Sequence, residues 1–251
     1  MILPRSFIDV PLAHRALHDV KDGRPENSLA AIRAAMALGF GIEIDLQISK
    51  DGQAMVFHDY DLQRLCGVTG AICQRTAEEL GNTPLIGSDE GIPTLRQVLD
   101  LVDGQVPLLI EIKDQDIKLG PNVGALEAAT AEVLSGYTGP VAVMSFNPHS
   151  VMELARLLPD IPRGLTTCNF ITDDWPLVPA DRREALAAIP DFDPTGSCFI
   201  SHQQDELDSP RVAALKARGI PILCWTIRSP QDEEKARQVA DNITFEGYLA
   251  S

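Results

Sequence analysis

The sequence predicts a single α/β domain, a (β/α)8 TIM barrel over residues 1–251 with a small insertion after the second strand. Short apolar runs alternate with amphipathic segments along the chain, which is typical of parallel βα units. Eight main strands can be counted in the 251 residues, and one such barrel needs roughly 250 residues. Hydrophobic residues make up 45% of the chain, which suffices for a full core.

Each strand is predicted from an apolar run, and each helix from the amphipathic segment that follows it. The expected strands lie at 10–16, 40–49, 106–113, 141–146, 163–167, 198–201, 221–227 and 242–245, with a short extra strand at 54–57. The expected helices lie at about 28–38, 94–102, 123–134, 150–157, 182–188, 210–217 and 230–239. The first helix has Asn27 or Ser28 as its N-cap and ends at Gly39.

The segment 60–92 interrupts this pattern because its periodicity is lost and turn residues accumulate. We expect an insertion there, with one short helix at 76–80, that caps the active site. The first nine residues are expected to seal part of the barrel. A doubly wound open sheet is the competing fold, but it usually has a glycine-rich loop after its first strand. The turn His14-Arg15-Ala16-Leu17-His18 lacks those glycines, which favours the barrel.

The charge balance disfavours several classes of partner. The formal net charge is −15, which argues against nucleic acid and against anionic membranes. The five cysteines are dispersed without a C-x-x-C motif, so reduced thiols are expected rather than zinc ligands or disulfides. We see neither a signal peptide nor an apolar run long enough for a membrane span, so we expect a cytoplasmic protein. A small-molecule substrate is the expected partner, and a homodimer is left open.

Two predicted strands each carry two ionisable residues at alternate positions. These are Glu43 and Asp45 on one strand, and Glu111 and Lys113 on another. Side chains two apart on a strand point to the same face, so each pair shares one side of its strand. Three carboxylates and one ammonium are unfavourable to bury unless they pair with one another or bind a cation. Two buried, salt-bridged strands and a metal-assisted active site are the two interpretations.

Further ionisable residues follow neighbouring strands, where the active sites of barrels lie. They are His14 and Arg15 after the first strand and His58 after the short extra strand. The three carboxylates are hard oxygen ligands suited to one Mg²⁺ or Ca²⁺. Arg15 and Lys113 suit a phosphoryl group, and two histidines can exchange protons near neutral pH. This combination favours cation-assisted phosphoryl chemistry.

The chain resembles the glycerophosphodiester phosphodiesterases, of the cytosolic bacterial type. The motifs that carry the resemblance are His14-Arg15, Pro25-Glu26-Asn27-Ser28, Ile42-Glu43-Ile44-Asp45, Lys50-Asp51-Gly52, Phe57-His58-Asp59, Glu111-Ile112-Lys113, Ser145-Phe146 and Trp225-Thr226. The resemblance implies a metal-dependent barrel that hydrolyses deacylated phospholipids to sn-glycerol 3-phosphate and an alcohol. It also implies Glu43, Asp45 and Glu111 as ligands, His14 and His58 as acid and base, and Arg15 and Lys113 as phosphate-binding residues. A cyclic phosphate formed by the glycerol hydroxyl is the usual route, and direct attack by water would need the same residues.

Two positions depart from the family pattern. Ala16 stands where glycine is usual, so its methyl group is expected either to limit the approach of a phosphate or to change the local backbone. Glu246 stands where the family has an aspartate, and either replaces it with a longer reach or is solvated. Both departures bear on substrate preference more than on the type of reaction.

Four weaker candidates remain. His202 follows the sixth main strand and is a candidate for contact with the leaving alcohol, with a surface histidine as the alternative. Trp225 ends a strand and is either a core residue or a platform for a choline-like cation. His18 is expected at the surface, and His149 at an ordinary polar position early in a helix.

Two other functions fit the same residues. A related phosphodiesterase that acts on lysophospholipids or phosphoinositides would need an exposed apolar groove, against which 5% aromatic residues and an acidic surface argue. A non-catalytic barrel that binds a phosphorylated ligand is the second alternative. The presence of both histidines, both cationic residues and all three carboxylates argues against it.

Overall fold

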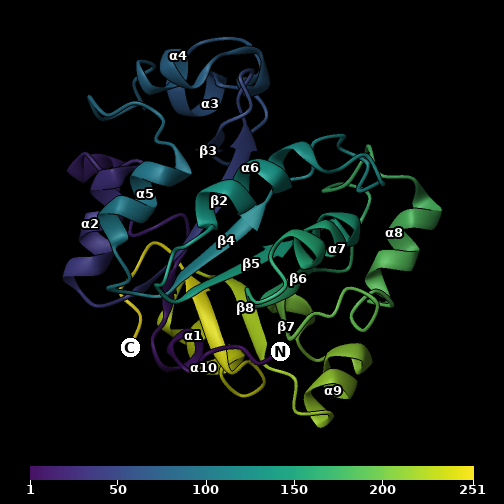
Figure 1. The fold of residues 1–251 in the computed structure, drawn as a ribbon. Coiled ribbons are helices and arrows are strands. Elements are labelled where there is room, and N and C mark those ends of the chain that lie inside the picture. Colours follow the sequence, from purple (N-terminus) through teal and green to yellow (C-terminus); the bar gives the residue numbers. More distant parts are fainter.

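The computed structural model describes residues 1–251 and confirms the predicted barrel (Figure 1). Eight parallel strands form a closed ring, because β1 pairs with both β2 and β9. Around the ring the strands are β1 (Leu12–Ala13), β2 (Gly41–Ile48), β4 (Leu108–Ile112), β5 (Val141–Ser145), β6 (Arg163–Thr167), β7 (Phe199–Gln203), β8 (Ile222–Ile227) and β9 (Asn242–Phe245). The ninth strand, β3 (Ala54–Val56), pairs antiparallel with the carboxyl end of β2.

Seven helices connect the barrel strands and surround them in Figure 1. They are α2 (Leu29–Ala37), α5 (Leu95–Val102), α6 (Ala125–Leu134), α7 (Pro148–Leu157), α8 (Ala180–Ala187), α9 (Pro210–Ala217) and α10 (Pro230–Ala236). Five of them, α2, α5, α7, α9 and α10, begin at a Ser, Thr or Asn whose side chain caps the first turn. Of the two expected N-caps of α2, Ser28 is the one used, since its hydroxyl accepts a hydrogen bond from the Ala31 amide. None of the helices is long and apolar enough to cross a membrane.

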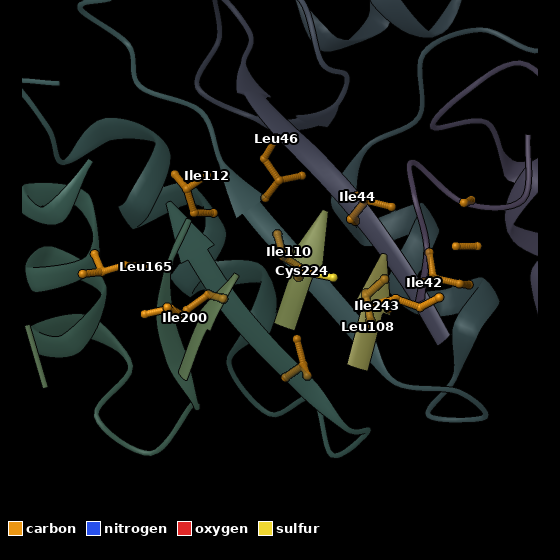
Figure 2. Packing of buried hydrophobic residues seen from close by; sticks show 14 of the residues in the cluster. Ile42, Ile44, Leu46, Leu108, Ile110, Ile112, Leu165, Ile200, Cys224 and Ile243 are labelled. Carbon is orange, nitrogen blue, oxygen red and sulfur yellow. The ribbon is translucent and has the colours of Figure 1, made fainter. Parts of the chain in front are cut away.

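The largest apolar cluster lies between the strands and the helices. Figure 2 shows Ile42, Ile44 and Leu46 of β2 beside Leu108 and Ile110 of β4, all fully buried in this layer. Because strand side chains alternate, the residues between them point into the barrel. Glu43, Asp45 and Glu111 therefore face the interior.

A smaller apolar cluster fills the amino-terminal end of the barrel interior. Phe7, from the short helix α1 (Ser6–Asp9), is fully buried there with Leu12, Leu109 and Phe199. The side-chain amide of Asn242 donates hydrogen bonds to the carbonyl groups of Phe7 and Val10, which ties the segment to β9. The first residues thus seal this end, as expected, and leave the carboxyl ends of the strands for a site.

The structure differs from the expected elements in several places. The first strand ends at Ala13 because Arg15 and Ala16 adopt positive φ angles of 50° and 64°. The insertion contains three short helices rather than one, namely α3 (Gln63–Cys66), the 3-10 helix η2 (Ile72–Gln74) and α4 (Ala77–Gly81). Two further 3-10 helices, η1 (Val20–Asp22) and η3 (Gln204–Glu206), lie in loops. The insertion has its own apolar cluster around Phe57, Leu62 and Leu80.

Candidate active site

A cavity of about 150 Å³ opens at the carboxyl ends of the barrel strands. It brings together all seven ionisable residues that the first half of the sequence pointed to. The lining residues are His14, Arg15, Glu43, Asp45, His58, Glu111, Lys113, Met144, Phe146, Thr166, Trp225, Thr226, Arg228 and Thr244. The last seven complete the wall from the second half of the chain. Only Trp225 among those was expected, although inward alternation on β5, β6 and β9 is a signal that could have found Met144, Thr166 and Thr244.

Three buried carboxylates form the floor of the cavity. Asp45 and Glu111 are paired across β2 and β4, and Glu43 lies two residues before Asp45. One oxygen of each of the three lies within 4.8 Å of the others. Burial, together with the neighbouring Asp45 and Glu111, raises the pKa of Glu43 well above its ordinary value. Buried oxygen donors at this spacing, whose mutual repulsion disfavours full ionisation, fit a hard divalent cation.

Lys113 contacts two of the three carboxylates. Its ammonium group lies 2.7 Å from Asp45 Oδ1 and 2.5 Å from Glu111 Oε1. Burial would lower the pKa of Lys113, but Asp45 and Glu111 outweigh burial and raise it. Burial likewise opposes ionisation of Asp45, yet Lys113 holds the pKa of that carboxyl well below its ordinary value. The structure therefore contains the buried salt bridges of the first interpretation, because Lys113 pairs with one carboxylate on each of the two strands.

Arg15 lies beside the same carboxylates on a strained turn. Its Nη1 donates to Glu26 Oε1 at 2.7 Å, and its Nε lies 3.6 Å from Asp45 Oδ2. Its backbone amide donates to Glu43 Oε2 at 2.9 Å. The next residue, Ala16, keeps the left-handed backbone that a glycine would adopt readily. Because Ala16 is buried in the apolar layer and does not line the cavity, its methyl group does not restrict a phosphate there.

Each of the two cavity histidines has its Nδ1 paired with a carboxylate. His14 Nδ1 lies 2.5 Å from Glu246 Oε2, and His58 Nδ1 lies 2.7 Å from Asp59 Oδ1. Such pairing sets the ring orientation and leaves Nε2 for a ligand in the cavity. Burial lowers the pKa of His14, and the hydrogen bond to Glu246 partly offsets this effect.

Glu246 is held in place rather than solvated. Its Oε1 accepts a hydrogen bond from Arg228 Nε at 2.8 Å, while Oε2 faces His14. Burial opposes ionisation of Glu246, but the hydrogen bond from His14 and the nearby His18 and Arg228 lower its pKa. His18, expected at the surface, is instead partly buried with its Nε2 3.5 Å from Glu246 Oε2. His149 lies early in α7, as expected.

His202 does not reach the cavity. It pairs in register with Cys224 of β8, which belongs to the apolar layer outside the barrel. Its ring is buried with Nδ1 2.7 Å from Thr167 Oγ1, and burial lowers its pKa to about 4. Contact between His202 and the leaving alcohol was expected because the predicted strand ends at Ser201. β7 continues to Gln203, so His202 is a strand residue on the outward face rather than the first residue of a loop.

Trp225 and Phe146 form an apolar wall of the cavity. Their rings meet edge to face with centroids 5.6 Å apart, and both residues line the cavity. Trp225 Nε1 donates to the Ser201 carbonyl oxygen at 3.1 Å, which holds the indole in place. Trp225 is thus partly a packed residue and partly a surface available to a ligand.

The insertion contributes no lining residue to the cavity but touches its surroundings. The Tyr60 hydroxyl donates to the Asp114 carbonyl oxygen at 2.6 Å, beyond the end of β4. Arg64 of α3 donates to Asp59 and to Glu26. In Figure 1 the insertion stands beyond β3, with α3 and α4 away from the helices that cover the barrel.

A polar cavity at the carboxyl ends of eight closed parallel strands places the chain among the (β/α)8-barrel enzymes. A model of the glycerophosphoryl diester phosphodiesterase family matches residues 14–242. A glycerophosphodiester phosphodiesterase of Caldanaerobacter subterraneus subsp. tengcongensis is 31% identical over 234 residues, covering 89% of this chain and 88% of that protein. The chain therefore belongs to the glycerophosphoryl diester phosphodiesterase family and is an enzyme of that family.

Solved structures show the same architecture. An Oleispira antarctica phosphodiesterase in complex with the product sn-glycerol-3-phosphate superposes with a TM-score of 0.76 at 25% identity, covering 96% of this chain and 94% of that one. A glycerophosphodiester phosphodiesterase from Thermotoga maritima has a TM-score of 0.71 at 22% identity, covering 94% of both chains. The second likeness bears on the fold alone.

Proposed function

We propose that this enzyme hydrolyses glycerophosphodiesters to sn-glycerol 3-phosphate and an alcohol, with a divalent cation at the carboxylates and with His14 and His58 as acid and base. The observation that carries this proposal is the pairing of each ring's Nδ1 with a carboxylate, in two histidines that line the same cavity. The family match and the product bound by the Oleispira antarctica enzyme support the substrate class.

Glu43, Asp45 and Glu111 are the residues that would hold Mg²⁺ or Ca²⁺. When bound, the cation would stabilise negative charge on the phosphoryl oxygens. Lys113 and Arg15 would then bind the phosphate, since both point into the same cavity and carry positive charge. In the structure Lys113 contacts Asp45 and Glu111. A cation bound to the same two carboxylates would neutralise part of their charge, so that Lys113 could also bind the phosphate.

The two histidines would move two protons in each phosphoryl transfer. The Nε2 atom of one ring accepts the proton of the attacking hydroxyl, while the other ring donates its proton to the oxygen of the departing alcohol. The attacking hydroxyl belongs either to the glycerol, which gives a cyclic phosphate that water opens, or to water itself. Glu246 and Asp59 keep Nδ1 occupied, so Nε2 is the atom that exchanges protons.

The alternatives receive less support from the site. A lysophospholipid needs room for an acyl chain, whereas this cavity holds about 150 Å³ and its apolar part is confined to one wall. A non-catalytic barrel has no use for two histidines whose rings are both oriented by carboxylates.

An assay of a panel of glycerophosphodiesters tests the proposal. Purified enzyme is treated with chelator and then resupplied with Mg²⁺ or Ca²⁺. The products measured are sn-glycerol 3-phosphate and the free alcohol from glycerophosphodiesters, and the free alcohol from lysophospholipids. We expect product only after resupply, with glycerophosphocholine or glycerophosphoethanolamine cleaved faster than the matching lysophospholipids. Equal rates in chelator, or cleavage of lysophospholipids alone, would contradict the proposal.

A further inference from the structure

We infer that Arg64, from the insertion, is a positioning residue for the reaction, which it serves without touching the substrate. The inference rests on the proposed function. Arg64 donates to both oxygens of Asp59, through Nε at 2.7 Å and Nη2 at 2.8 Å. It also donates to both oxygens of Glu26, through Nη1 at 2.8 Å and Nη2 at 2.9 Å. One guanidinium therefore holds two carboxylates with two-point geometry, which a lysine cannot reproduce.

Each of these carboxylates holds a residue of the cavity. Asp59 Oδ1 lies 2.7 Å from His58 Nδ1, and Glu26 Oε1 accepts a hydrogen bond from Arg15 Nη1 at 2.7 Å. The contacts form one continuous series, from His58 through Asp59, Arg64 and Glu26 to Arg15. The proposed acid or base and the proposed phosphate-binding arginine are thus held through the same guanidinium.

The charges in this series depend on one another. Burial opposes ionisation of Asp59 and of Glu26, but hydrogen bonds from His58 and Arg64 lower the pKa of Asp59, and those from Arg64 and Arg15 lower that of Glu26. Without Arg64, Asp59 would keep only His58 as a side-chain hydrogen-bond partner, and Glu26 only Arg15. Both carboxylates would then be free to turn, and the residues that they hold would turn with them.

The insertion is built in a way that presents Arg64 at this place. Its helix α3 is flanked by Leu62, fully buried in the insertion's own apolar cluster, and by Gly67, whose left-handed backbone ends the helix. The insertion thereby affects the reaction although none of its residues lines the cavity. Its proposed contribution is to keep His58 and Arg15 in position rather than to cover the cavity.

A purely structural role for Arg64 predicts a different result. The Arg64 side chain is 49% exposed, but its partners Glu26 and Asp59 are only 12% and 22% exposed, so a purely structural role predicts a lower melting temperature with the kcat of the folded enzyme unchanged. A suitable control is Arg33 of α2, which is 55% exposed and also pairs with a carboxylate across the boundary of the insertion, through Glu90 Oε1 at 3.0 Å. Arg33 belongs to a separate ion pair that involves neither His58 nor Arg15.

The experiment compares Arg64→Met, Arg64→Lys and Arg33→Met with the wild type. For Arg64→Met we expect kcat to fall about tenfold to a hundredfold, the scale that misplacement of a reacting group produces, with a smaller change in KM. Arg64→Lys should fall between Arg64→Met and the wild type. Arg33→Met should keep wild-type kcat. Arg33→Met should melt within about 4 °C of the wild type, as expected for an exposed ion pair in a chain of this size, and kcat of every variant is measured well below its own melting temperature.

A second measurement needs no turnover. The hydrogen-bonded Nδ1 proton of His58 is followed by NMR, and it should exchange faster with water in Arg64→Met than in the wild type or in Arg33→Met. Wild-type kcat together with an unchanged Nδ1 proton in Arg64→Met would overturn the inference. An equal loss of kcat in Arg33→Met would also overturn it. A wild type that cleaves no glycerophosphodiester, but shows the expected change in the Nδ1 proton, would refute the proposed function and leave the positioning role standing.

Discussion

The first and second halves of the barrel contribute different chemistry to the same cavity. Strands β1 to β4 and their loops supply the ionisable residues, while β5 to β9 supply thioether, hydroxyl and aromatic side chains. Arg228 is the one charged lining residue of the second half, and it points to Glu246 rather than to the carboxylates of the floor. The difference suggests that the first half performs the reaction and that the second half shapes the space for the substrate's alcohol.

The largest effect should come from removing either histidine of the first half. We expect His14→Ala and His58→Ala each to lower kcat by about a hundredfold or more, the usual scale for a positioned acid or base. Steady-state kinetics measure the loss, with His149→Ala as a control of similar chemistry outside the cavity. If either variant kept near-full activity, its proton-transfer role would be wrong.

Lys113 should matter for both stability and turnover. Lys113→Met leaves Asp45 and Glu111 buried without their ammonium partner, and loss of one member of a buried ion pair costs about 3–5 kcal/mol. We expect a lower melting temperature in chelator, partial recovery with excess Mg²⁺ or Ca²⁺, and a lower kcat/KM at saturating cation. Unchanged kinetics with tighter cation binding would instead make Lys113 a counter-charge only, and Arg15 would have to hold the phosphate alone.

A residue of the second half should affect substrate preference more than the rate of reaction. Trp225→Leu removes an aromatic face that lines the cavity, and a cation over such a face gains about 0.5–2 kcal/mol. We expect KM for glycerophosphocholine to rise by about twofold to thirtyfold, with less change for a diester whose alcohol is uncharged. A fall in kcat as large as that of His58→Ala would abolish the distinction between the halves.

The smallest effect on activity should come from His202, which lies outside the cavity. Its folded pKa of about 4 is below the unfolded value, so its contribution is fully present above about pH 6.5 and is lost as pH falls toward 4. The shift corresponds to about 3 kcal/mol. In urea titrations, His202→Gln should reduce the loss of stability between pH 7 and pH 4.5 while leaving kcat at pH 7 nearly unchanged. An unaltered pH dependence, or a loss of kcat like that of His14→Ala, would contradict this assignment.

Most of the ionisable residues from the first half of the barrel could be predicted from the sequence, because their placement depends on the local periodicity of strands. Alternation along one strand suffices to put Glu43 and Asp45 on one face, and β4 repeats the pattern with Glu111. The same rule failed for His202, since a strand end misplaced by two residues makes an outward strand residue look like part of a loop. The barrel itself followed from the alternation of strands and helices.

The contacts that orient the site could not be predicted in the same way. Glu246 meets His14 only because β9 closes against β1, across 232 residues of sequence. Arg64 reaches Glu26 across 38 residues from an insertion that showed no periodicity. Both contacts depend on tertiary placement, which local patterns do not encode.

Cation binding by the carboxylates of the first half is the central claim, and calorimetric titration tests it most directly. Mg²⁺ or Ca²⁺ is titrated into the wild type, into Asp45→Asn and into the control Glu90→Gln. Glu90 belongs to the insertion, and its carboxylate pairs with Arg33 of α2. We expect one cation per chain in the wild type and in the control, and at least about tenfold weaker binding by Asp45→Asn, which loses a charged oxygen ligand. Equal binding by Asp45→Asn, or no binding by the wild type, would contradict the account.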